Sequence, residues 1–296
     1  MSTSGVLYAG IDIGGTTVKL GAVSADGRLM RRASAPTPVG DPRALAALCA
    51  RLVAEHCPEA AGVGVACAGR VNLQTGEISA SNLNWVRAPF ARLLKERLGF
   101  APALDNDVQA ALYGEWKAGA CKGLSDVLYV ALGTGIGGAL ILRGRPYRGP
   151  DNMGGEIGHM VTHAQGDSCP CGRSGCFERY ASAKALERAA GGLNARAVFS
   201  RAQAGDPQMR GVLDRYIEEL CVGLSNLNAL FHPQVTLIGG GLSYAGPALL
   251  GAIRSCLGST GALSAGETVP LVELAALAGD AGVIGAALMA ADRGGL

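Results

Sequence analysis

Two segments about 120 residues apart carry the same pattern of strand, glycine turn and strand. In the first, the apolar run at residues 6–13 ends at Gly14-Gly15, and a second strand follows. In the second, residues 127–132 end at Gly133-Thr134-Gly135, and a strand follows over 139–142. Short apolar runs bounded by glycine predict buried strands. Their repetition predicts a duplicated fold with one glycine turn in each half.

Helices and further strands fill the chain around these two units. Helical periodicity covers residues 42–56 and about 89–98, another helix begins near residue 106, and an apolar stripe at helical spacing runs over 209–231. The remaining predicted strands are apolar runs at residues 62–67, near 103, 235–238 and 269–274. Strands that alternate with helices define an α/β protein. We expect two domains, residues 1–118 with 281–296 and residues 119–280.

The balanced composition excludes several kinds of partner. The formal net charge is +2 and aromatic residues make up 5% of the chain, so neither nucleic acid nor a charged membrane surface is expected. No basic targeting region precedes the first apolar run, and no charge-free stretch is long enough to span a membrane. Six of the nine cysteines are scattered through apolar segments, which is typical of thiols in a reducing compartment. We therefore expect a cytoplasmic protein.

The other three cysteines belong to the most specific motif of the sequence. Its candidate ligands follow the spacing H-x9-C-x-C-x4-C and are His159, Cys169, Cys171 and Cys176. Three thiolates and one imidazole complete a tetrahedral zinc shell with no position left for a reacting water, so we expect a structural zinc ion. The alternative is coincidence or a remnant of a disulfide, which the proline and glycines between the ligands disfavour. Glu156 and Glu178 bracket the motif, so the loop presents two carboxylates.

A third glycine turn, Gly239-Gly240-Gly241, follows another predicted strand. Glycine lets the backbone approach a phosphate and direct its N–H groups inward, and the threonines of the first two turns add hydroxyl donors. Asp12 precedes the first turn and is a candidate to hold Mg²⁺ through water. The alternative is that each turn only reverses the chain, which is less expected of three turns at strand ends than of one.

The run Gly133-x-Gly135-x-x-Gly138 also matches the dinucleotide fingerprint, which makes an NAD-dependent oxidoreductase the alternative from another class of enzyme. That fingerprint opens a helix. Here it leads into an apolar run that is predicted to be a strand, so we expect the match to be false.

Three polar residues, Asp105, Asn106 and Asp107, stand at the start of a predicted helix. A single Asn or Asp there is explained by capping, and we assign that role to Asp105. A second carboxylate within the first turn is better explained by a ligand. A sugar hydroxyl is one such ligand, because transfer of a phosphoryl group to it needs a carboxylate that accepts its proton.

Taken together, these residues resemble the ROK family of bacterial sugar kinases and repressors. The resemblance runs from Ile11-Asp12-Ile13-Gly14-Gly15-Thr16 to the last helix, and Gly-Gly-Glu-Ile-Gly-His before the cysteines is its most specific part. It implies an actin-like, ribonuclease H-like ATPase fold, with two α/β domains around a cleft that holds ATP and sugar. It also implies a homodimer.

The resemblance assigns roles residue by residue. Asp107 matches the catalytic base of the family. The residues that match its sugar contacts are Gly69, Arg70, Asn82, Asn106, Glu156, His159 and Glu178, so that His159 would bind both zinc and sugar. The residues that match its ATP and Mg²⁺ contacts are Asp12, Gly14, Gly15, Thr16, Thr17, Lys19, Gly133, Thr134, Gly135, Gly239, Gly240 and Gly241.

The sequence is most similar to the glucokinase branch, through Asn-Leu-x-Trp at residues 82–85 and the first two glycine turns. It departs from that branch at Gly69-Arg70-Val71-Asn72, where glucokinases often carry Gly-Pro-Val-Asp and N-acetylmannosamine kinases resemble this chain. We therefore expect ATP-dependent phosphorylation of a hexose at its 6-hydroxyl, with glucose preferred and N-acetylmannosamine or N-acetylglucosamine as alternatives. Polyphosphate in place of ATP, and a tetramer in place of a dimer, stay open. A repressor is the third class, but only eleven residues precede Asp12, too few for a helix-turn-helix domain.

Overall fold

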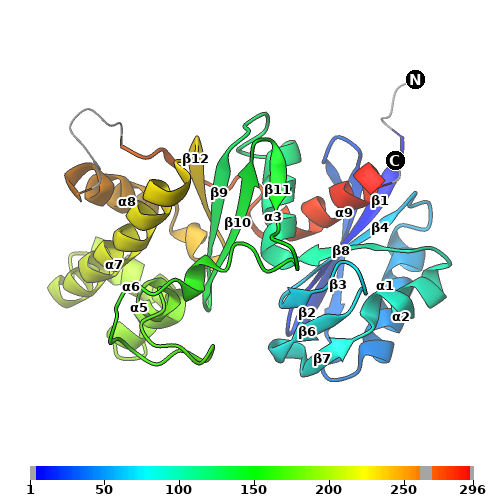
Figure 1. Ribbon diagram of the computed structural model, residues 1–296, viewed down its shortest axis with the longest axis horizontal. Coiled ribbons are helices and arrows are strands. Elements are labelled where there is room, and N and C mark those ends of the chain that lie inside the picture. Colours follow the sequence, from blue (N-terminus) through cyan, green and yellow to red (C-terminus); the bar gives the residue numbers. More distant parts are fainter. Residues whose placement is uncertain (1–4, 261–268, 294–296) are drawn as a thin grey trace. The chain divides into compact units, whose positions relative to one another are not determined.

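The computed structural model describes residues 5–260 and 269–293 (Figure 1). Contacts group these residues into two units. Unit 1 comprises the chain up to Gly123, Pro146–Gly154 and the chain from Gly279 onward, and unit 2 comprises Leu124–Arg145 and Gly155–Ala278. The sequence-based division placed its boundaries after residues 118 and 280 instead and did not separate residues 146–154 from their neighbours.

Unit 1 is built on a five-stranded sheet of order β3-β2-β1-β4-β8. Its strands are β1 (Leu7–Ile13), β2 (Thr17–Ser24), β3 (Leu29–Pro36), β4 (Val63–Cys67) and β8 (Ala103–Asn106). β1, β2 and β3 pair antiparallel, whereas β1, β4 and β8 run parallel. Parallel neighbours place their carboxyl ends at one edge of the sheet, which is where ligands bind in open α/β sheets.

Four helices and a small sheet complete unit 1. The helices are α1 (Pro42–His56), α2 (Phe90–Leu98), α3 (Asp107–Ala118) and α9 (Ala281–Arg293), and the small antiparallel sheet contains β5 (Arg70–Val71), β6 (Ile78–Ala80) and β7 (Trp85–Ala88). α9 packs against α3 and directly on β1 and β4. A Cβ atom on Gly10 or Gly64 would overlap the backbone of α9, so these glycines permit the close approach.

Unit 2 repeats the arrangement of hairpin and parallel strands. Its sheet has the order β11-β10-β9-β12-β13, with strands β11 (Arg145–Tyr147, of which the last two residues are grouped with unit 1), β10 (Ile136–Leu142), β9 (Val127–Leu132), β12 (Val235–Gly239) and β13 (Val272–Leu274). β9 pairs antiparallel with β10 and parallel with β12. The predicted duplication of strand, glycine turn and strand is therefore confirmed. The last strand was predicted to begin at residue 269 but begins at Val272, because the preceding residues make no ladder.

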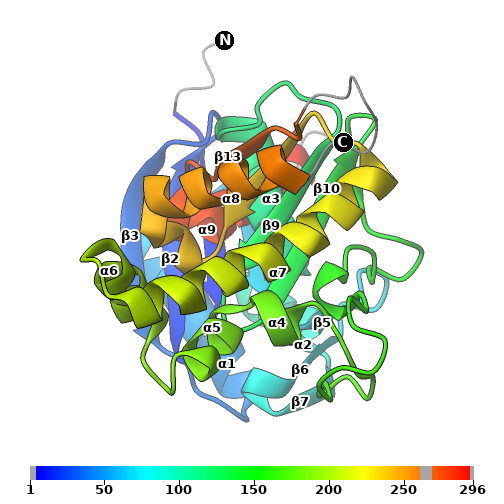
Figure 2. The same cartoon turned by 90° about the vertical axis from the view of Figure 1, so that its left-hand side faces the viewer.

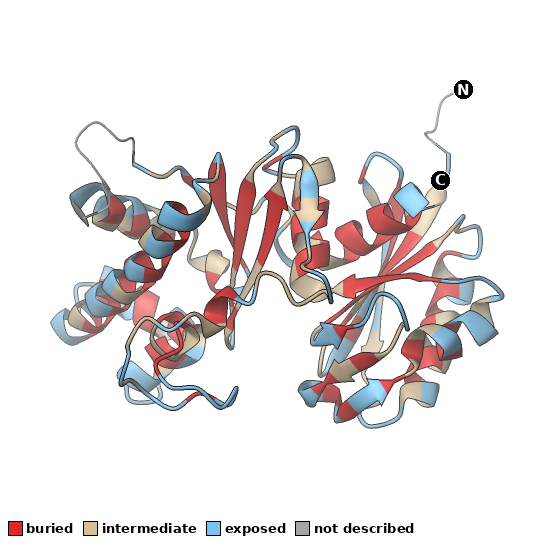
Figure 3. Ribbon diagram, in the orientation of Figure 1, coloured by how far each residue is buried: buried red, intermediate tan, exposed pale blue. Residues whose placement is uncertain are grey.

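The helices of unit 2 are α4 (Glu178–Ala181), α5 (Ala183–Ala189), α6 (Ala195–Gln203), α7 (Pro207–Phe231) and α8 (Gly246–Thr260). Figure 2 shows α7 and α8 side by side over one face of the sheet, and residues of both helices share one core with β9, β10 and β12. Figure 3 shows that burial is concentrated on the strands and on one side of each helix. None of the helices in the described ranges has the length and hydropathy needed to cross a membrane.

Candidate functional site

The carboxyl ends of the parallel strands in unit 1 gather two carboxylates and a thiol. Asp12 lies one residue from the end of β1, Cys67 ends β4, and Asp107 opens α3 directly after β8. Cys67 is the register partner of Ile13 on one side and of Asn106 on the other, so the three strands end level with one another. The sequence placed Asp12 and Asp107 about 95 residues apart, and the sheet brings them together.

Both carboxylates are partly deprived of water. Burial, followed by the negative charge of Asp12, raises the pKa of Asp107 to about 6. Burial also raises the pKa of Asp12, although the ammonium group of Lys19 partly offsets this effect. A carboxylate with a pKa close to neutral is suited to accept a proton at physiological pH. A cation between the two groups would relieve the cost of burying two like charges.

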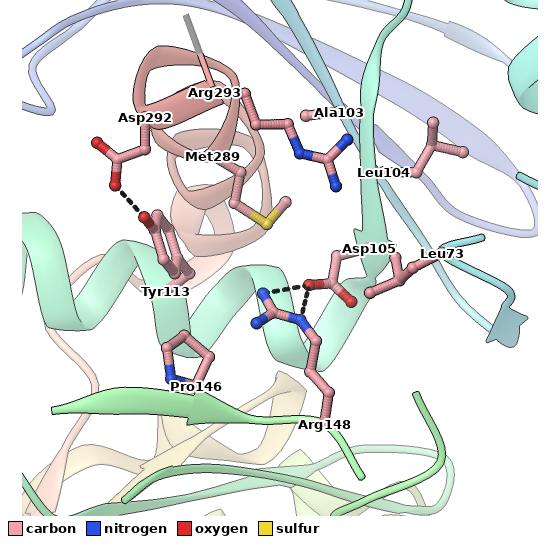
Figure 4. Close-up of a pocket in the computed structure, with 10 residues that line it drawn as sticks. All are labelled: Leu73, Ala103, Leu104, Asp105, Tyr113, Pro146, Arg148, Met289, Asp292 and Arg293. Carbon is pink, nitrogen blue, oxygen red and sulfur yellow. Dashed lines mark hydrogen bonds and ion pairs between the residues drawn. The ribbon is translucent and has the colours of Figure 1, made fainter. Parts of the chain in front are cut away.

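The prediction that Asp105 caps helix α3 is wrong. The N-cap is Asn106, whose side-chain oxygen accepts hydrogen bonds from the backbone N–H groups of Val108 at 2.8 Å and Gln109 at 3.3 Å. Asp105 lies inside β8 with an exposure of 1%, and its side chain is not among the acceptors for the N–H groups of Val108 and Gln109. It accepts hydrogen bonds from Arg148 instead (Figure 4).

Asn106 also fixes the segment that contains Gly69. Its side-chain N–H donates to the carbonyl oxygen of Gly69 at 3.0 Å. Gly69 has φ of 122°, and a Cβ atom there would overlap the carbonyl oxygen of Ser79, so only glycine fits. The structure therefore brings two predicted sugar contacts, Gly69 and Asn106, to the start of the helix that carries Asp107.

Arg70, another predicted sugar contact, has a partner within unit 1. Its guanidinium group forms an ion pair of 3.0 Å with Asp151, and both side chains are more than half exposed. Asp151 lies in Pro146–Gly154, a segment of unit 1 that the sequence-based division assigned to the other domain. No local signal could have revealed this pair, because the two residues are 81 positions apart.

The first glycine turn is a compact loop beside another predicted sugar contact. The N–H of Gly14 donates to the carbonyl oxygen of Thr17 at 3.0 Å, and the exposed Asn82 lies within van der Waals distance of Gly15. Thr16 and Thr17 are exposed at the turn. Lys19 is the register partner of Asp12, but its ammonium group donates to the carbonyl oxygen of Gly279 at 3.2 Å.

The second and third glycine turns lie side by side in unit 2. They follow β9 and β12, which are parallel neighbours with Gly239 level with Ala131. Gly240 has φ of 78° and packs against the backbone of Leu132, so the third turn abuts the residue that precedes the second. The second turn leads into strand β10 rather than a helix, as predicted, and so does not have the geometry of a dinucleotide fingerprint.

The four candidate metal ligands converge in unit 2. The ligand atoms of His159, Cys169, Cys171 and Cys176 all lie within 4.8 Å of one another. Nδ1 of His159 is 3.7 Å from the sulfur of Cys169, and the sulfurs of Cys171 and Cys176 are 3.6 Å apart. Cys169, Cys171 and Cys176 lie in a described range and none of them forms a disulfide, so their thiols are available to a metal. A backbone hydrogen bond from Arg173 lowers the pKa of Cys171 to about 6, which favours the thiolate that a metal requires.

Glu178 lies directly against this cluster. Its Oε1 atom is 3.3 Å from the sulfur of Cys169 and 3.8 Å from Nδ1 of His159. A Cβ atom on Gly135 would overlap Oε2 of Glu178, so the second glycine turn approaches the same carboxylate. Glu156 is exposed and precedes the short 3-10 turn Ile157–His159. Unit 2 therefore brings together the Cys/His cluster, Glu178 and the second glycine turn.

The chain belongs to the ROK family, whose profile matches residues 8–293. It is 33% identical to a glucokinase of Halalkalibacterium halodurans, across 94% of this chain and 93% of that protein. It is 31% identical to an N-acetylmannosamine kinase of Shigella boydii, across 95% of this chain and 97% of that protein.

Among solved structures, the chain resembles a ROK family glucokinase from Streptomyces griseus in complex with glucose and AMPPNP. The TM-score is 0.85 at 30% identity, and the match covers 97% of this chain and 99% of the other. The expected fold class, that of the actin-like ROK kinases, is confirmed.

Proposed function

We propose that the protein transfers the γ-phosphoryl group of Mg-ATP to the 6-hydroxyl of a hexose, with glucose preferred. The observation that carries the proposal is the partly buried carboxylate of Asp107, whose raised pKa and position after the capping residue Asn106 suit a general base. Membership in the ROK family and similarity to glucokinases over nearly the full chain support the same reaction.

In the proposed reaction, Asp107 accepts the proton of the 6-hydroxyl while the oxygen attacks the γ-phosphorus and ADP leaves. Phosphoryl transfer is catalysed mainly by positioning and by neutralisation of charge. The glycine turns at residues 14–17, 133–135 and 239–241 are proposed to hold the nucleotide phosphates through backbone N–H groups, with hydroxyl donors from Thr16, Thr17 and Thr134. Lys19 is proposed to contribute positive charge near Asp12.

Magnesium fits the residues around Asp12. This carboxylate is partly buried with a raised pKa, and its nearest basic partner, Lys19, also bonds to Gly279. Mg²⁺ favours one carboxylate with water and phosphate oxygens rather than a cage of protein ligands. When bound, the ion would neutralise the charge of the triphosphate, and Asp12 would hold it through water.

Zinc fits the Cys/His cluster. A tetrahedral ion with Zn–S bonds of about 2.3 Å separates its sulfur ligands by about 3.8 Å and a sulfur–nitrogen pair by about 3.6 Å. The sulfurs of Cys171 and Cys176 are 3.6 Å apart, and Cys169 and His159 are 3.7 Å apart. We propose that zinc here is structural. Because Nδ1 of His159 faces the thiols, Nε2 is the nitrogen proposed to bind the sugar.

Each unit contains several of the proposed sugar contacts. In unit 1, the contacts near the start of α3 or beside the first glycine turn are Gly69, Asn82 and Asn106. In unit 2, the contacts on or next to the loop that contains the Cys/His cluster are Glu156, His159 and Glu178. Arg70 is proposed to act at the same site, although its ion pair with Asp151 makes a direct contact depend on release of that pair.

The test is a screen of purified protein with Mg-ATP or polyphosphate against glucose, mannose, N-acetylmannosamine and N-acetylglucosamine. The expected result is ATP-dependent formation of glucose 6-phosphate at the highest efficiency. N-acetylmannosamine is the second candidate, because the Gly-Arg pair at residues 69–70 resembles kinases of that sugar. Phosphorylation of none of the four sugars would overturn the proposal. Light scattering tests the homodimer that we also propose.

A further inference from the structure

The segment Pro146–Gly154 is tied to strand β5 and to the start of helix α3 by several interactions within unit 1. Nδ2 of Asn152 donates to the carbonyl oxygen of Val71 at 3.1 Å. The side chain of Gln109 donates to the carbonyl oxygens of Tyr147 at 3.4 Å and Gly154 at 3.3 Å. We call residues 146–154 the strap. Two residues after the strap, the chain reaches Glu156 of unit 2, a proposed sugar contact.

The ion pair between Asp105 and Arg148 is the most buried of these ties. Nε and Nη2 of Arg148 both donate to Oδ2 of Asp105, at 2.8 and 2.7 Å. The side chain of Asp105 is 1% exposed and that of Arg148 is 26% exposed. Figure 4 shows the guanidinium group beside the carboxylate at the end of β8. In a site shielded from water, such a charge-assisted pair has a defined geometry that an exposed pair lacks.

The second carboxylate oxygen of Asp105 accepts a hydrogen bond from the residue that precedes the proposed base. Oδ1 of Asp105 accepts a hydrogen bond from the backbone N–H of Asn106 at 2.9 Å and another from Asn152 at 3.2 Å. The Asp105 side chain therefore holds the strap through Oδ2. Through Oδ1 it holds both the strap and Asn106, the N-cap of α3. Asp107 is the next residue after that cap.

The hydrogen bonds, rather than dense packing around them, determine the geometry of the Asp105–Arg148 pair. Asp105 and Arg148 line a cavity of about 320 Å³, together with apolar side chains such as Leu104 and Met289 (Figure 4). Dense packing therefore does not fix Arg148 on the side of the cavity. A lysine at position 148 would find room and keep the positive charge, but it could not donate from two nitrogens of a planar group.

We propose that Asp105 and Arg148 are positioning residues, which hold Asn106 and Asp107 in the orientation required for proton transfer from the sugar. This inference rests on the proposed function. Loss of the pair would let the strap and the start of α3 shift, and a displacement of about 1 Å at a catalytic group lowers rates strongly. The hydrogen bonds of the first glycine turn are made within the turn and with Thr37, so we expect binding of Mg-ATP to be little affected.

The experiment compares Arg148→Lys and Asp105→Asn with the wild type in steady-state kinetics. A matched control exists in unit 2, where Nε and Nη2 of Arg201 donate to Oδ2 of Asp206 at 2.8 and 2.5 Å. Asp206 is the N-cap of helix α7. Arg201→Lys and Asp206→Asn therefore change the same kind of ion pair at a position far from the proposed base in sequence. Each rate is divided by the folded fraction from circular dichroism.

We expect kcat to fall at least about tenfold in Arg148→Lys and Asp105→Asn, with the KM for Mg-ATP within twofold of the wild type. The double variant should be no slower than the worse single variant, because both changes break one interaction. The controls should keep kcat within twofold. If Asp105→Asn does not fold, Arg148→Lys alone carries the test.

Two results would overturn the inference, and they are distinguishable. If the wild type phosphorylates a hexose and both variants lose thermal stability but keep kcat, the pair is only structural. If the wild type phosphorylates no hexose, the proposed function fails and the positioning role fails with it.

Discussion

Replacement of Asp107 by asparagine is expected to stabilise the ligand-free protein while it removes catalysis. Burial, followed by the charge of Asp12, raises the pKa of Asp107 from 3.8 to about 6. A carboxyl group with a higher pKa in the folded state contributes stability that is complete below the unfolded pKa and is lost as the pH rises through about 6. At about 1.4 kcal/mol per pKa unit, the raised pKa of Asp107 lowers the free energy of unfolding by on the order of 3 kcal/mol at pH 8 and by roughly half of that at pH 5.

Asparagine carries no charge and removes this cost. Urea unfolding of wild type and Asp107→Asn without Mg²⁺ should therefore show a gain in the free energy of unfolding that is about twofold larger at pH 8 than at pH 5. Turnover should fall at least about a hundredfold, while direct binding of glucose stays within a few-fold. Asp26→Asn is the control, because hydrogen bonding by Ser24 lowers the pKa of Asp26 and no gain is expected. A variant that is less stable than the wild type at pH 8 would refute the reasoning.

The remaining predictions concern the metal, the nucleotide, the pH profile and the sugar. Cys171→Ser should lose zinc, thermal stability and glucose affinity together, and metal analysis of the native protein that finds no zinc would contradict the site. Mg-ATP should raise the unfolding temperature and NAD should not, since only a bound ligand stabilises the folded state. Below pH 6, kcat/KM should fall about tenfold per pH unit as Asp107 becomes protonated. The efficiency for glucose should exceed that for N-acetylmannosamine, and a tenfold advantage for N-acetylmannosamine would reverse the proposed order.

The features that the sequence predicted are those encoded locally. The cysteine spacing, the glycine turns and the apolar runs each lie within a few residues, and the structure gathers the four candidate metal ligands within 4.8 Å as the spacing indicates. The small sheet β5-β6-β7 was missed because its strands are only two to four residues long and carry no clear alternation. The strap was missed because its partners lie elsewhere in the chain. Arg148 is 43 residues from Asp105, so no local pattern links them.

The contrast between Asp105 and Asp107 explains why only one of them is suited to be a base. Asp105 accepts hydrogen bonds from Arg148, Asn152 and the N–H of Asn106, so its lone pairs are occupied by donors that a proton from a sugar would have to displace. Asp107 is partly buried near another carboxylate, that of Asp12, and hydrogen bonds from its neighbours only partly offset the rise in its pKa. A carboxylate whose oxygens all accept hydrogen bonds stabilises the local structure. A carboxylate that is removed from water gains the most free energy when it takes up a proton. The sequence shows two acidic residues that look equivalent, and only the contacts made by distant segments give them different chemistry.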